Sequence, residues 1–518
     1  MLLRFVRTAL AVLSVLAITF LFIDVTGVAA EYFSWLPRLQ LVPALLSGAF
    51  VTVLAIAVVT LLCGRIYCSV VCPLGILQDV ISRVAALFSS RTKRRIGRFH
   101  FRPARSVVRN VLLGLFVVLL LLGLADVWAV TTASLIEPYS AYGRIATSIF
   151  GPAVEWFNNS VLAPWAESHD SYAFFRISFY INVSIVVIAA VTLVVVGVFA
   201  WIEGRGYCNT VCPVGTVLGY LSRFALLRPV IDTDKCNGCR SCERHCKASC
   251  IDSKTHTIDM SRCVDCMDCL TACRQHAISF KLRKKELPAY KVSHDGEIDA
   301  KSFSTADGGR RHFLSVVGLA SGALVASAAT GKLDGGLTAV HPKRPVKRAV
   351  KVVPPGAQGH THVAQHCVGC QLCVQNCPNG VLRASSDLDS FMQPVMDFTD
   401  GYCAPQCTVC SEVCPAGVFH PLDEALKSST KVGGAVVNLD SCISATQGVD
   451  CGSCASHCPS EAITMVESDS GRLIPVVDDA ACIGCGACEF HCPVGTVDSI
   501  KGTSSAIHVE GLETHRTI

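Results

Sequence analysis

The chain has 518 residues and 30 cysteines, hydrophobic residues make up 51% of it, and its formal net charge is +5. This length indicates about three or four structural units, and the positive mean hydropathy of +0.46 indicates that part of the chain lies in lipid. The basic residues are clustered, which indicates a membrane orientation and gives no support to nucleic-acid binding. No Cys-x-x-Cys-His sequence occurs, which excludes covalently attached c-type haem.

Four apolar runs in residues 1–230 predict four membrane spans, because each has about the ~20 residues that a helix needs to cross the hydrocarbon core. They lie near residues 9–23, 41–63, 107–130 and 177–202. The first run resembles a signal peptide, but no good small-residue cleavage site precedes Asp24, so we expect a retained helix. The loop between the second and third runs is rich in basic residues and is therefore expected in the cytoplasm, as are both ends of the four-span unit. Its basic residues are Arg83, Arg91, Lys93, Arg94, Arg95, Arg98, Arg102, Arg105 and Arg109.

The sequence Gly-Arg-x-Tyr-Cys-x-x-Val-Cys-Pro-x-Gly occurs twice, at residues 64–75 and 204–215. Each copy follows an outside-to-inside helix, so the repeats are parallel. Cysteines four residues apart share a helix face, and two copies predict a thiolate site for a metal or an iron–sulfur cluster. Its ligands would be Cys68, Cys72, Cys208 and Cys212. The alternative is that these are packing cysteines on short interfacial helices. Arg65 and Arg205 either neutralise a cluster or anchor helix ends at headgroups.

The third loop, predicted outside, contains Glu137-Pro138-Tyr139-Ser140-Ala141-Tyr142-Gly143-Arg144. Aromatic residues with one acid and one arginine near the outer surface predict a quinol site. Oxidising a quinol requires a proton acceptor, for which Glu137 is the candidate, with Tyr139 and Arg144 beside it. The alternative is an aromatic belt with a loop turn.

Residues 231–280 predict a cytoplasmic ferredoxin module with two [4Fe-4S] clusters whose fourth ligands are crossed. One cluster is assigned to Cys236, Cys239, Cys242 and Cys273. The other is assigned to Cys263, Cys266, Cys269 and Cys246. Lys247 and Arg274 stand where a proline usually follows the fourth cysteine, and Cys250 is a spare thiol that can substitute for Cys246.

Residues 281–309 are polar and predict a linker. Residues 310–331 begin with Arg310-Arg311-His312-Phe313-Leu314 and resemble a twin-arginine export signal, with a candidate cleavage site at Ala328. A basic, proline-containing linker follows at 332–361. Its charge opposes export, but long domains translocate largely regardless of charge, so we expect export. The alternative is a weak fifth span or a buried helix, with a cytoplasmic C-terminal domain.

Residues 362–512 contain four cysteine groups, each ending in Cys-Pro, which is the pattern of bacterial ferredoxins. Disulfides or zinc are the alternative, but zinc sites usually show Cys-x-x-Cys pairs. The groups are Cys367, Cys370, Cys373, Cys377; Cys403, Cys407, Cys410, Cys414; Cys442, Cys451, Cys454, Cys458; and Cys482, Cys485, Cys488, Cys492.

The four spans, the two Cys-x-x-x-Cys-Pro repeats and the ferredoxin module resemble the membrane iron–sulfur subunit of a quinol dehydrogenase of the periplasmic nitrate reductase type. Relatives in nitrous-oxide reductase maturation and cytochrome oxidase copper handling share these parts. Residues 310–500 resemble that system's exported partner with four [4Fe-4S] clusters, so the chain looks like a fusion of the two. The resemblance implies that the first C-terminal motif pairs with the fourth, and the second with the third. It implies the ligand sets Cys367, Cys370, Cys373, Cys492; Cys482, Cys485, Cys488, Cys377; Cys403, Cys407, Cys410, Cys458; and Cys442, Cys451, Cys454, Cys414.

The expected fold class is a membrane α-helical four-span bundle with a parallel repeat, joined to α+β ferredoxin-like polyferredoxin domains. The expected function is electron relay in the bacterial inner membrane, from quinol through six [4Fe-4S] clusters to a periplasmic reductase or multihaem cytochrome. One alternative is an electron donor for the maturation of a metal centre in a partner protein. Another is a non-catalytic iron–sulfur subunit of a larger oxidoreductase, so the sequence leaves open whether the chain is itself an enzyme.

Overall fold

The computed structural model describes residues 2–24, 28–91, 99–122, 127–169, 183–282, 343, 346–387, 390–468, 471–494 and 505–518. Residues 1–281 and 341–518 form one unit, and residues 282–340 form a second. Apart from Leu282, the second unit lies outside the described residues. The predicted polar linker, the twin-arginine-like segment and the candidate cleavage site at Ala328 therefore lie outside them too.

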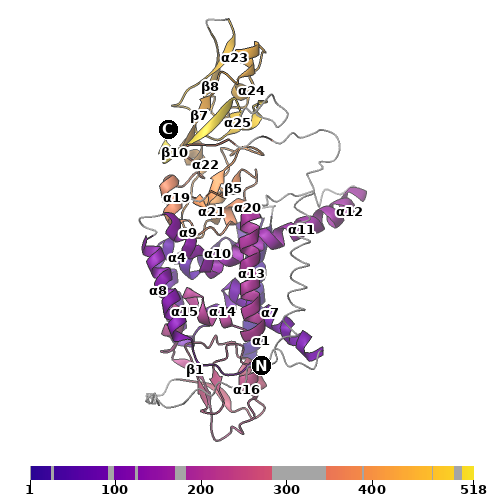
Figure 1. The fold of residues 1–518 in the computed structure, drawn as a ribbon, viewed down its shortest axis with the longest axis vertical. Helices are drawn as coiled ribbons and strands as arrows, with labels where there is room; N and C mark the ends of the chain where they lie inside the picture. Colours follow the sequence, from indigo (N-terminus) through magenta and orange to yellow (C-terminus); the bar gives the residue numbers. More distant parts are fainter. Residues whose placement is uncertain are drawn as a thin grey trace, which may run out of the picture. The chain divides into compact units, whose positions relative to one another are not determined.

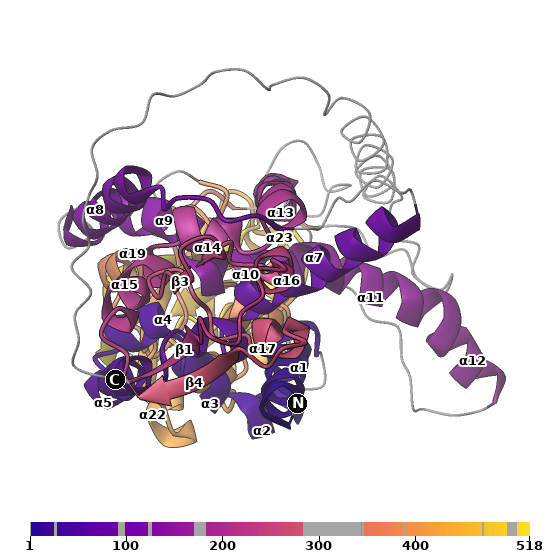
Figure 2. The same ribbon diagram turned by 90° about the horizontal axis from the view of Figure 1, so that it is seen from below.

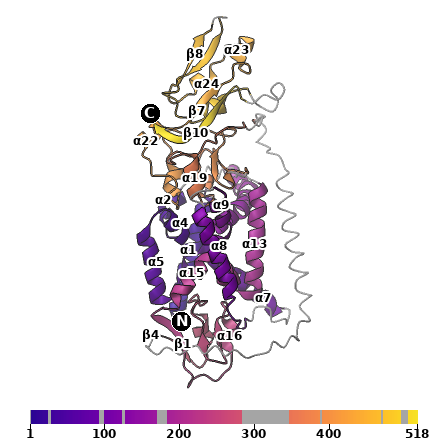
Figure 3. The ribbon, with the colours of Figure 1, turned by 60° about the vertical axis from the view of Figure 1, so that its left-hand side comes forward.

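Four apolar helices form the frame of residues 1–230: α1 (Leu2–Ile23), α5 (Phe50–Cys63), α8 (Ser106–Leu122) and α13 (Val183–Glu203). Helices α8 and α13 run upright in Figure 1, and α5 is seen beside its label in Figure 3. Among the described residues, Leu3–Ile23 and Val183–Glu203 are long and apolar enough to cross a membrane, whereas α5 and α8 are apolar but shorter.

The predicted span near residues 41–63 is broken in the structure. It forms α4 (Leu41–Leu46) and then α5. Gly48 lies between them with a φ of +69°, a left-handed conformation that interrupts a helix. The short helices α2 (Val28–Phe33) and α3 (Trp35–Arg38) precede α4.

Each Cys-x-x-x-Cys-Pro repeat folds as a short helix followed by a second helix that starts at the proline. The pairs are α6 (Tyr67–Val70) with α7 (Pro73–Arg91), and α14 (Gly206–Thr210) with α15 (Pro213–Ser222). Proline is favoured at the first helical position, where its missing N–H is not needed. Gly64 and Gly204, the first residues of the two repeats, have φ values of +78° and +66°, so the chain turns where each repeat begins.

The predicted outer loop is helical in the structure. After α9 (Val127–Ile136), α10 (Pro138–Ile145) begins at a cap formed by Glu137, whose side chain accepts a hydrogen bond from the Ser140 N–H. The helix continues through η1 (Ala146–Phe150), α11 (Gly151–Phe157), η2 (Asn158–Leu162) and α12 (Ala163–Ser168), which follow one another without a break in Figure 2.

The first ferredoxin module packs two small sheets around two short helices. Strand β1 (Leu227–Ile231) pairs with β4 (Ile278–Leu282), and β2 (Ile251–Asp252) pairs antiparallel with β3 (Thr257–Ile258). Helices α16 (Ser241–His245) and α17 (Asp268–Ala272) each end at the fourth cysteine of a motif.

The C-terminal domain repeats this plan with three sheets of two strands each among its described residues. Strand β5 (Leu382–Ala384) pairs with β6 (Pro394–Met396), β8 (Ile463–Glu467) with β9 (Leu473–Val477), and β7 (Thr430–Val437) with β10 (Ile507–Thr517). Val352 and Val353, in the predicted linker, are buried against the domain. The helices are α19 (His360–His366), α20 (Leu372–Gln375), α21 (Val409–Val413), α22 (Glu424–Ser429), α23 (Ile443–Gln447), α24 (Ser453–Ser456) and α25 (Ala487–His491).

The two ferredoxin parts contact opposite ends of α1. Near its start, Arg4 forms an ion pair of 2.9 Å with Asp268 in the first module. Near its end, the carbonyl oxygen of Leu21 accepts a hydrogen bond of 3.0 Å from Asn376 in the C-terminal domain. At 1.5 Å per helical residue, these two contacts lie roughly 25 Å apart along α1.

Candidate functional site

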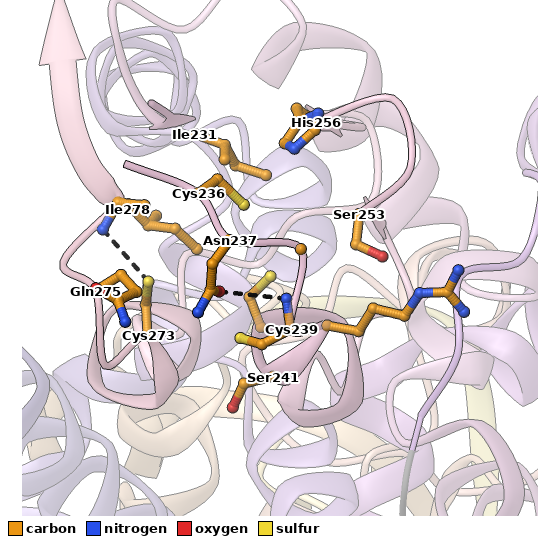
Figure 4. A pocket seen from close by; sticks show the side chains of 14 residues that line it. Ile231, Cys236, Asn237, Cys239, Ser241, Ser253, His256, Cys273, Gln275 and Ile278 are labelled. Atoms are coloured by element: carbon orange, nitrogen blue, oxygen red, sulfur yellow. Dashed lines mark hydrogen bonds between the residues drawn. The ribbon is translucent and has the colours of Figure 1, made fainter. Parts of the chain in front are cut away.

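The first cluster site, site I, consists of Cys236, Cys239, Cys242 and Cys273, which line one cavity (Figure 4). The loop is shaped by Gly238 and Arg240, whose φ values are +67° and +56°. The Cys273 sulfur accepts a hydrogen bond of 3.3 Å from the Ala277 N–H, and backbone donors of this kind stabilise a thiolate. The three close cysteines and the distant fourth are those that the crossed assignment predicts.

Site II consists of Cys246, Cys263, Cys266 and Cys269, which line a second cavity. This is again the predicted crossed set. The spare thiol, Cys250, lines the same cavity, and its sulfur lies 3.5 Å from that of Cys246. Either thiol is therefore placed to face a cluster here.

The C-terminal motifs pair differently from the prediction. Site III consists of Cys367, Cys370, Cys373 and Cys414, which line one cavity. The predicted fourth ligand, Cys492, belongs elsewhere. Site IV is formed by the second motif and consists of Cys403, Cys407, Cys410 and Cys377. Burial raises the pKa of the Cys410 thiol, and the other three thiols lie close enough to raise it further. The first motif thus exchanges its fourth cysteine with the second.

The third and fourth motifs exchange ligands in the same way. Burial raises the pKa of the Cys488 thiol, and Cys485, Cys482 and Cys458 raise it further; these four thiols form site V. Site VI consists of Cys442, Cys451, Cys454 and Cys492, which line a cavity of their own. Each C-terminal motif therefore exchanges its fourth cysteine with a motif next to it in the sequence.

The sites fit cubane clusters. All thirty cysteines are free thiols. In the described part of the chain, no three His, Cys, Asp or Glu side chains converge on one position as a single metal ion requires. A cube makes no such demand, because each of its four thiolates binds a different iron.

The four cysteines of the two Cys-x-x-x-Cys-Pro repeats form a second kind of candidate site, the four-cysteine site. Cys68, Cys72, Cys208 and Cys212 are each 3% exposed. The repeats are interlocked by their arginines. Arg205 Nη1 donates a hydrogen bond of 2.7 Å to the Cys68 carbonyl, and Arg65 Nη2 donates one of 3.3 Å to the Cys208 carbonyl.

Both arginines of this site are fully buried, but only Arg205 is paired with a carboxylate. Arg205 binds both oxygens of Asp79, at 2.7 and 2.9 Å. Lys247 Nζ donates to the same carboxylate at 2.7 Å, and Arg7 lies 3.8 Å from it. Arg65 instead donates to the Asn209 side chain and the Ser261 carbonyl, at 2.9 and 3.0 Å. This excess of buried positive charge fits a site that holds thiolates.

Asp79 and Gln78, both on α7, were not predicted from the sequence. Gln78 Nε2 lies 3.1 Å from the Cys208 sulfur. The sequence did mark Lys247 as unusual, because a lysine stands where the ferredoxin pattern has a proline after Cys246. It pairs with Asp79 and Asp268, at 2.7 and 3.3 Å, and so ties the ferredoxin module to the four-cysteine site.

The predicted quinol residues lie together on α10 and are buried; we call Glu137, Tyr139 and Arg144 the α10 site. Burial raises the pKa of the Glu137 carboxyl, while the hydrogen bond from Ser140 lowers it. Arg144 Nη2 donates a hydrogen bond of 2.9 Å to the Ser134 carbonyl. Among the described residues, the Arg144 Nε and Nη1 atoms and the Tyr139 hydroxyl are buried without a hydrogen-bond partner. Unpartnered buried polar atoms in such a group indicate a place for a polar ligand.

The α10 site lies directly against site III. A Cβ atom built on Gly143 would lie 2.5 Å from the Cys370 carbonyl oxygen. Burial raises the pKa of the Tyr139 hydroxyl well above its usual value, and the Cys370 thiolate raises it further. On the other side of the site, the Tyr207 hydroxyl of the second repeat donates a hydrogen bond of 3.2 Å to the Ile136 carbonyl, just before Glu137.

Comparison with known proteins supports the iron–sulfur assignment. A family model described as a 4Fe-4S binding domain matches residues 46–96 and 182–231, and a 4Fe-4S dicluster domain matches residues 366–418 and 449–496. The methylamine utilization ferredoxin-type protein MauM of Methylobacillus flagellatus is 33% identical over 168 residues, which are 31% of this chain and 70% of MauM. The chain belongs to the family of ferredoxin-type iron–sulfur proteins.

Other members of the ferredoxin-type family are similar over comparable lengths. The ferredoxin-type protein NapG of Escherichia coli is 29% identical over 187 residues, which are 34% of this chain and 78% of NapG. NapF of the same organism is 28% identical over 154 residues, or 30% of this chain and 87% of NapF. No solved structure matches the chain. A role in iron–sulfur electron transfer follows from this membership.

Proposed function

We propose that the chain oxidises a membrane quinol at the α10 site and delivers the electrons through sites III to VI to a periplasmic reductase or multihaem cytochrome. The observation that carries this proposal is the group of unpartnered buried polar atoms on α10 beside site III. The chain is then a quinol dehydrogenase of the bacterial inner membrane. Its four apolar helices are the spans, and its C-terminal domain is exported.

Oxidation of a quinol releases two protons and two electrons. Glu137 accepts the proton of one quinol hydroxyl, because the burial that raises its pKa also makes the carboxylate a stronger base, and the proton of the other hydroxyl is released to the outer aqueous phase. The Tyr139 hydroxyl and the free Arg144 donors hold the quinol oxygens, since they lack other partners. Bound [4Fe-4S] clusters supply one-electron redox chemistry, with potentials set by burial and by hydrogen bonds to sulfur.

The C-terminal sites are arranged so that each contacts the next. Sites III and IV share two crossed motifs, as do sites V and VI. The Cys403 N–H of site IV donates a hydrogen bond of 2.9 Å to the Cys485 carbonyl of site V. Electrons that enter site III from α10 therefore have a continuous route through the domain.

Export of the C-terminal domain is supported by the contacts of α1. If α1 spans the bilayer, Asp268 and Asn376, which bind its two ends, lie on opposite sides of the membrane. The expected result in spheroplasts is that added protease cleaves residues 340–518 and spares residues 231–280. Protection of both segments would contradict export.

The catalytic part of the proposal is tested by anaerobic addition of a quinol analogue to the purified full-length chain. We expect bleaching of the iron–sulfur absorbance and the appearance of reduced-cluster EPR signals. Dithionite provides the fully reduced control. If dithionite reduces the clusters and no quinol does, the chain is not a quinol dehydrogenase.

A further inference from the structure

Site I has no place in the proposed quinol route. The α10 site contacts site III, so electrons pass into the C-terminal domain without entering sites I and II. Sites I and II nevertheless connect to the rest of the protein. Arg65 of the four-cysteine site donates a hydrogen bond of 3.0 Å to the Ser261 carbonyl beside site II, and Asn209 Nδ2 donates one of 3.2 Å to the Ala248 carbonyl. Sites I and II therefore require an electron donor or acceptor of their own.

Site I is open to solvent. All thirty cysteines lie in the described part of the chain, and Cys239 is the only one that is exposed. Its neighbours Asn237, Gly238 and Arg240 are exposed as well. Figure 4 shows Cys236, Cys239 and Cys273 around the same cavity, close to the surface residues Asn237 and Gln275. An iron–sulfur cluster held here would lie at the protein surface, where a second protein can approach it.

The surface around site I is basic. The exposed cations Lys235, Arg240 and Arg274 are each the immediate sequence neighbour of a site I cysteine. Lys254 is exposed in the turn beside Ser253, which lines the same cavity. We call these four residues the site I face. Among the neighbouring acids, Asp232 lies 3.7 Å from Lys235, and Asp234 is exposed.

The surface beside site VI, the last of the six cluster sites, is acidic where the site I face is basic. Site VI is flanked by exposed Asp440 and Asp450, which stand next to exposed Leu439 and Val449. The nearby cation Arg472 does not pair with these acids, because its Nη1 donates hydrogen bonds to the Ala445 and Thr446 carbonyls at the end of α23. Surfaces of opposite charge select different partners, so the two ends of the protein do not serve the same carrier.

We propose that site I is a second electron port, which docks a small acidic one-electron carrier of the ferredoxin class at the site I face. The inference rests on the proposed function only in that the quinol route leaves site I free. In the step, the reduced carrier loses one electron and the site I cluster gains it. No bond is made or broken, and no proton moves. The crossed ligands Cys273 and Cys246 join site I to site II, so the electron continues toward the four-cysteine site.

The test measures binding of a plant-type [2Fe-2S] ferredoxin, which is acidic, to the full-length chain in lipid nanodiscs, under anaerobic conditions and without quinol. We expect saturable binding that weakens as salt is raised, since the complementary charges are screened. The triple variant Lys235→Glu, Arg240→Glu, Arg274→Glu should bind at least about tenfold more weakly. Arg516→Glu, a single reversal of the same kind at an exposed residue of β10, is the control and should bind like the unchanged chain.

A second readout is reoxidation of the reduced ferredoxin, which should be fast with the unchanged chain and slow with the triple variant. The iron and sulfide contents of both must be equal, so that a loss of site I is not mistaken for a loss of docking. Salt-insensitive binding, or equal weakening by Arg516→Glu, would overturn the proposal. Because no quinol is present, a negative result here leaves the quinol proposal standing, and failure of quinol oxidation leaves ferredoxin binding unaffected.

Discussion

Two buried polar groups of the helical half, the four-cysteine site and the α10 site, differ in how their polar atoms are satisfied. At the four-cysteine site, Arg205 and Lys247 both bind Asp79, and Arg65 makes three hydrogen bonds to oxygen atoms. The described atoms that lack a partner there are Arg65 Nε, Arg7 Nε and Gln78 Oε1, and each belongs to a side chain that is hydrogen-bonded through its other polar atoms. At the α10 site, Tyr139 has no hydrogen-bond partner for its hydroxyl, and two of the three Arg144 nitrogens lack one.

The difference separates structural from ligand-binding polar groups. A buried group whose partners are all protein atoms stabilises one packing of the chain, and removing a partner costs stability. A buried group without a partner already carries its desolvation cost, which a ligand can offset on binding. We therefore expect substitutions at the four-cysteine site to reduce stability, and substitutions at the α10 site to reduce quinol oxidation.

The largest effect is expected for Glu137→Gln. The amide can still cap α10 but cannot take a proton, so quinol-driven cluster reduction should slow by about 10²- to 10⁴-fold. The rate is measured by stopped-flow absorbance with a quinol analogue. Reduction by dithionite and the melting temperature should stay unchanged, and an equal loss of dithionite reduction would show that the variant had lost clusters instead of a base.

The next largest effect is expected for Asp79→Ala, which leaves Arg205 buried without its carboxylate and leaves Lys247 with Asp268 alone. The free energy of unfolding should fall by about 3–5 kcal/mol, measured by chemical denaturation in detergent. The control is Asp387→Ala, which removes the partner of Lys351 in an ion pair whose carboxylate is 68% exposed. It should cost about 1 kcal/mol or less. Equal losses in the two variants would contradict a special role for the buried network.

The smallest effects come from a matched pair of tyrosines. The Tyr67 hydroxyl donates to Gln40 at 2.9 Å and accepts from the Leu41 N–H at 3.2 Å, so Tyr67→Phe should lower the free energy of unfolding by about 1 kcal/mol. Tyr139→Phe removes a hydroxyl without a partner and should leave stability unchanged or slightly higher. It should instead weaken quinol binding by about fivefold, measured as the apparent KM. A stability loss in Tyr139→Phe together with weaker quinol binding in Tyr67→Phe would contradict this assignment.

The sequence determined much of the chemistry by itself. The spacing of three close cysteines fixes a short loop that brings their sulfurs together, and this holds at sites I, II, III and V whatever the rest of the fold does. The crossing of Cys246 and Cys273 in the first module also follows from the sequence, because that module has only two motifs to exchange ligands.

Other features were decided by the tertiary structure. Four motifs can exchange their fourth cysteines in several ways, and local spacing does not choose among them. The structure joins Cys414 to site III and Cys492 to site VI. Likewise, Gly48 breaks a run that hydropathy alone presents as one span, because a single left-handed residue outweighs apolar composition.

The buried partners of the repeats show the same limit. The two copies of Gly-Arg-x-Tyr-Cys are nearly identical in sequence, yet Arg205 binds Asp79 and Arg65 binds Asn209. The position of α10 against Cys370 joins residues that are more than two hundred positions apart in the chain. Short-range spacing fixes which atoms can share a loop, whereas contacts between distant segments depend on how the whole chain packs. The sequence therefore predicts which close cysteines share a loop, whereas packing decides which distant cysteine joins each loop.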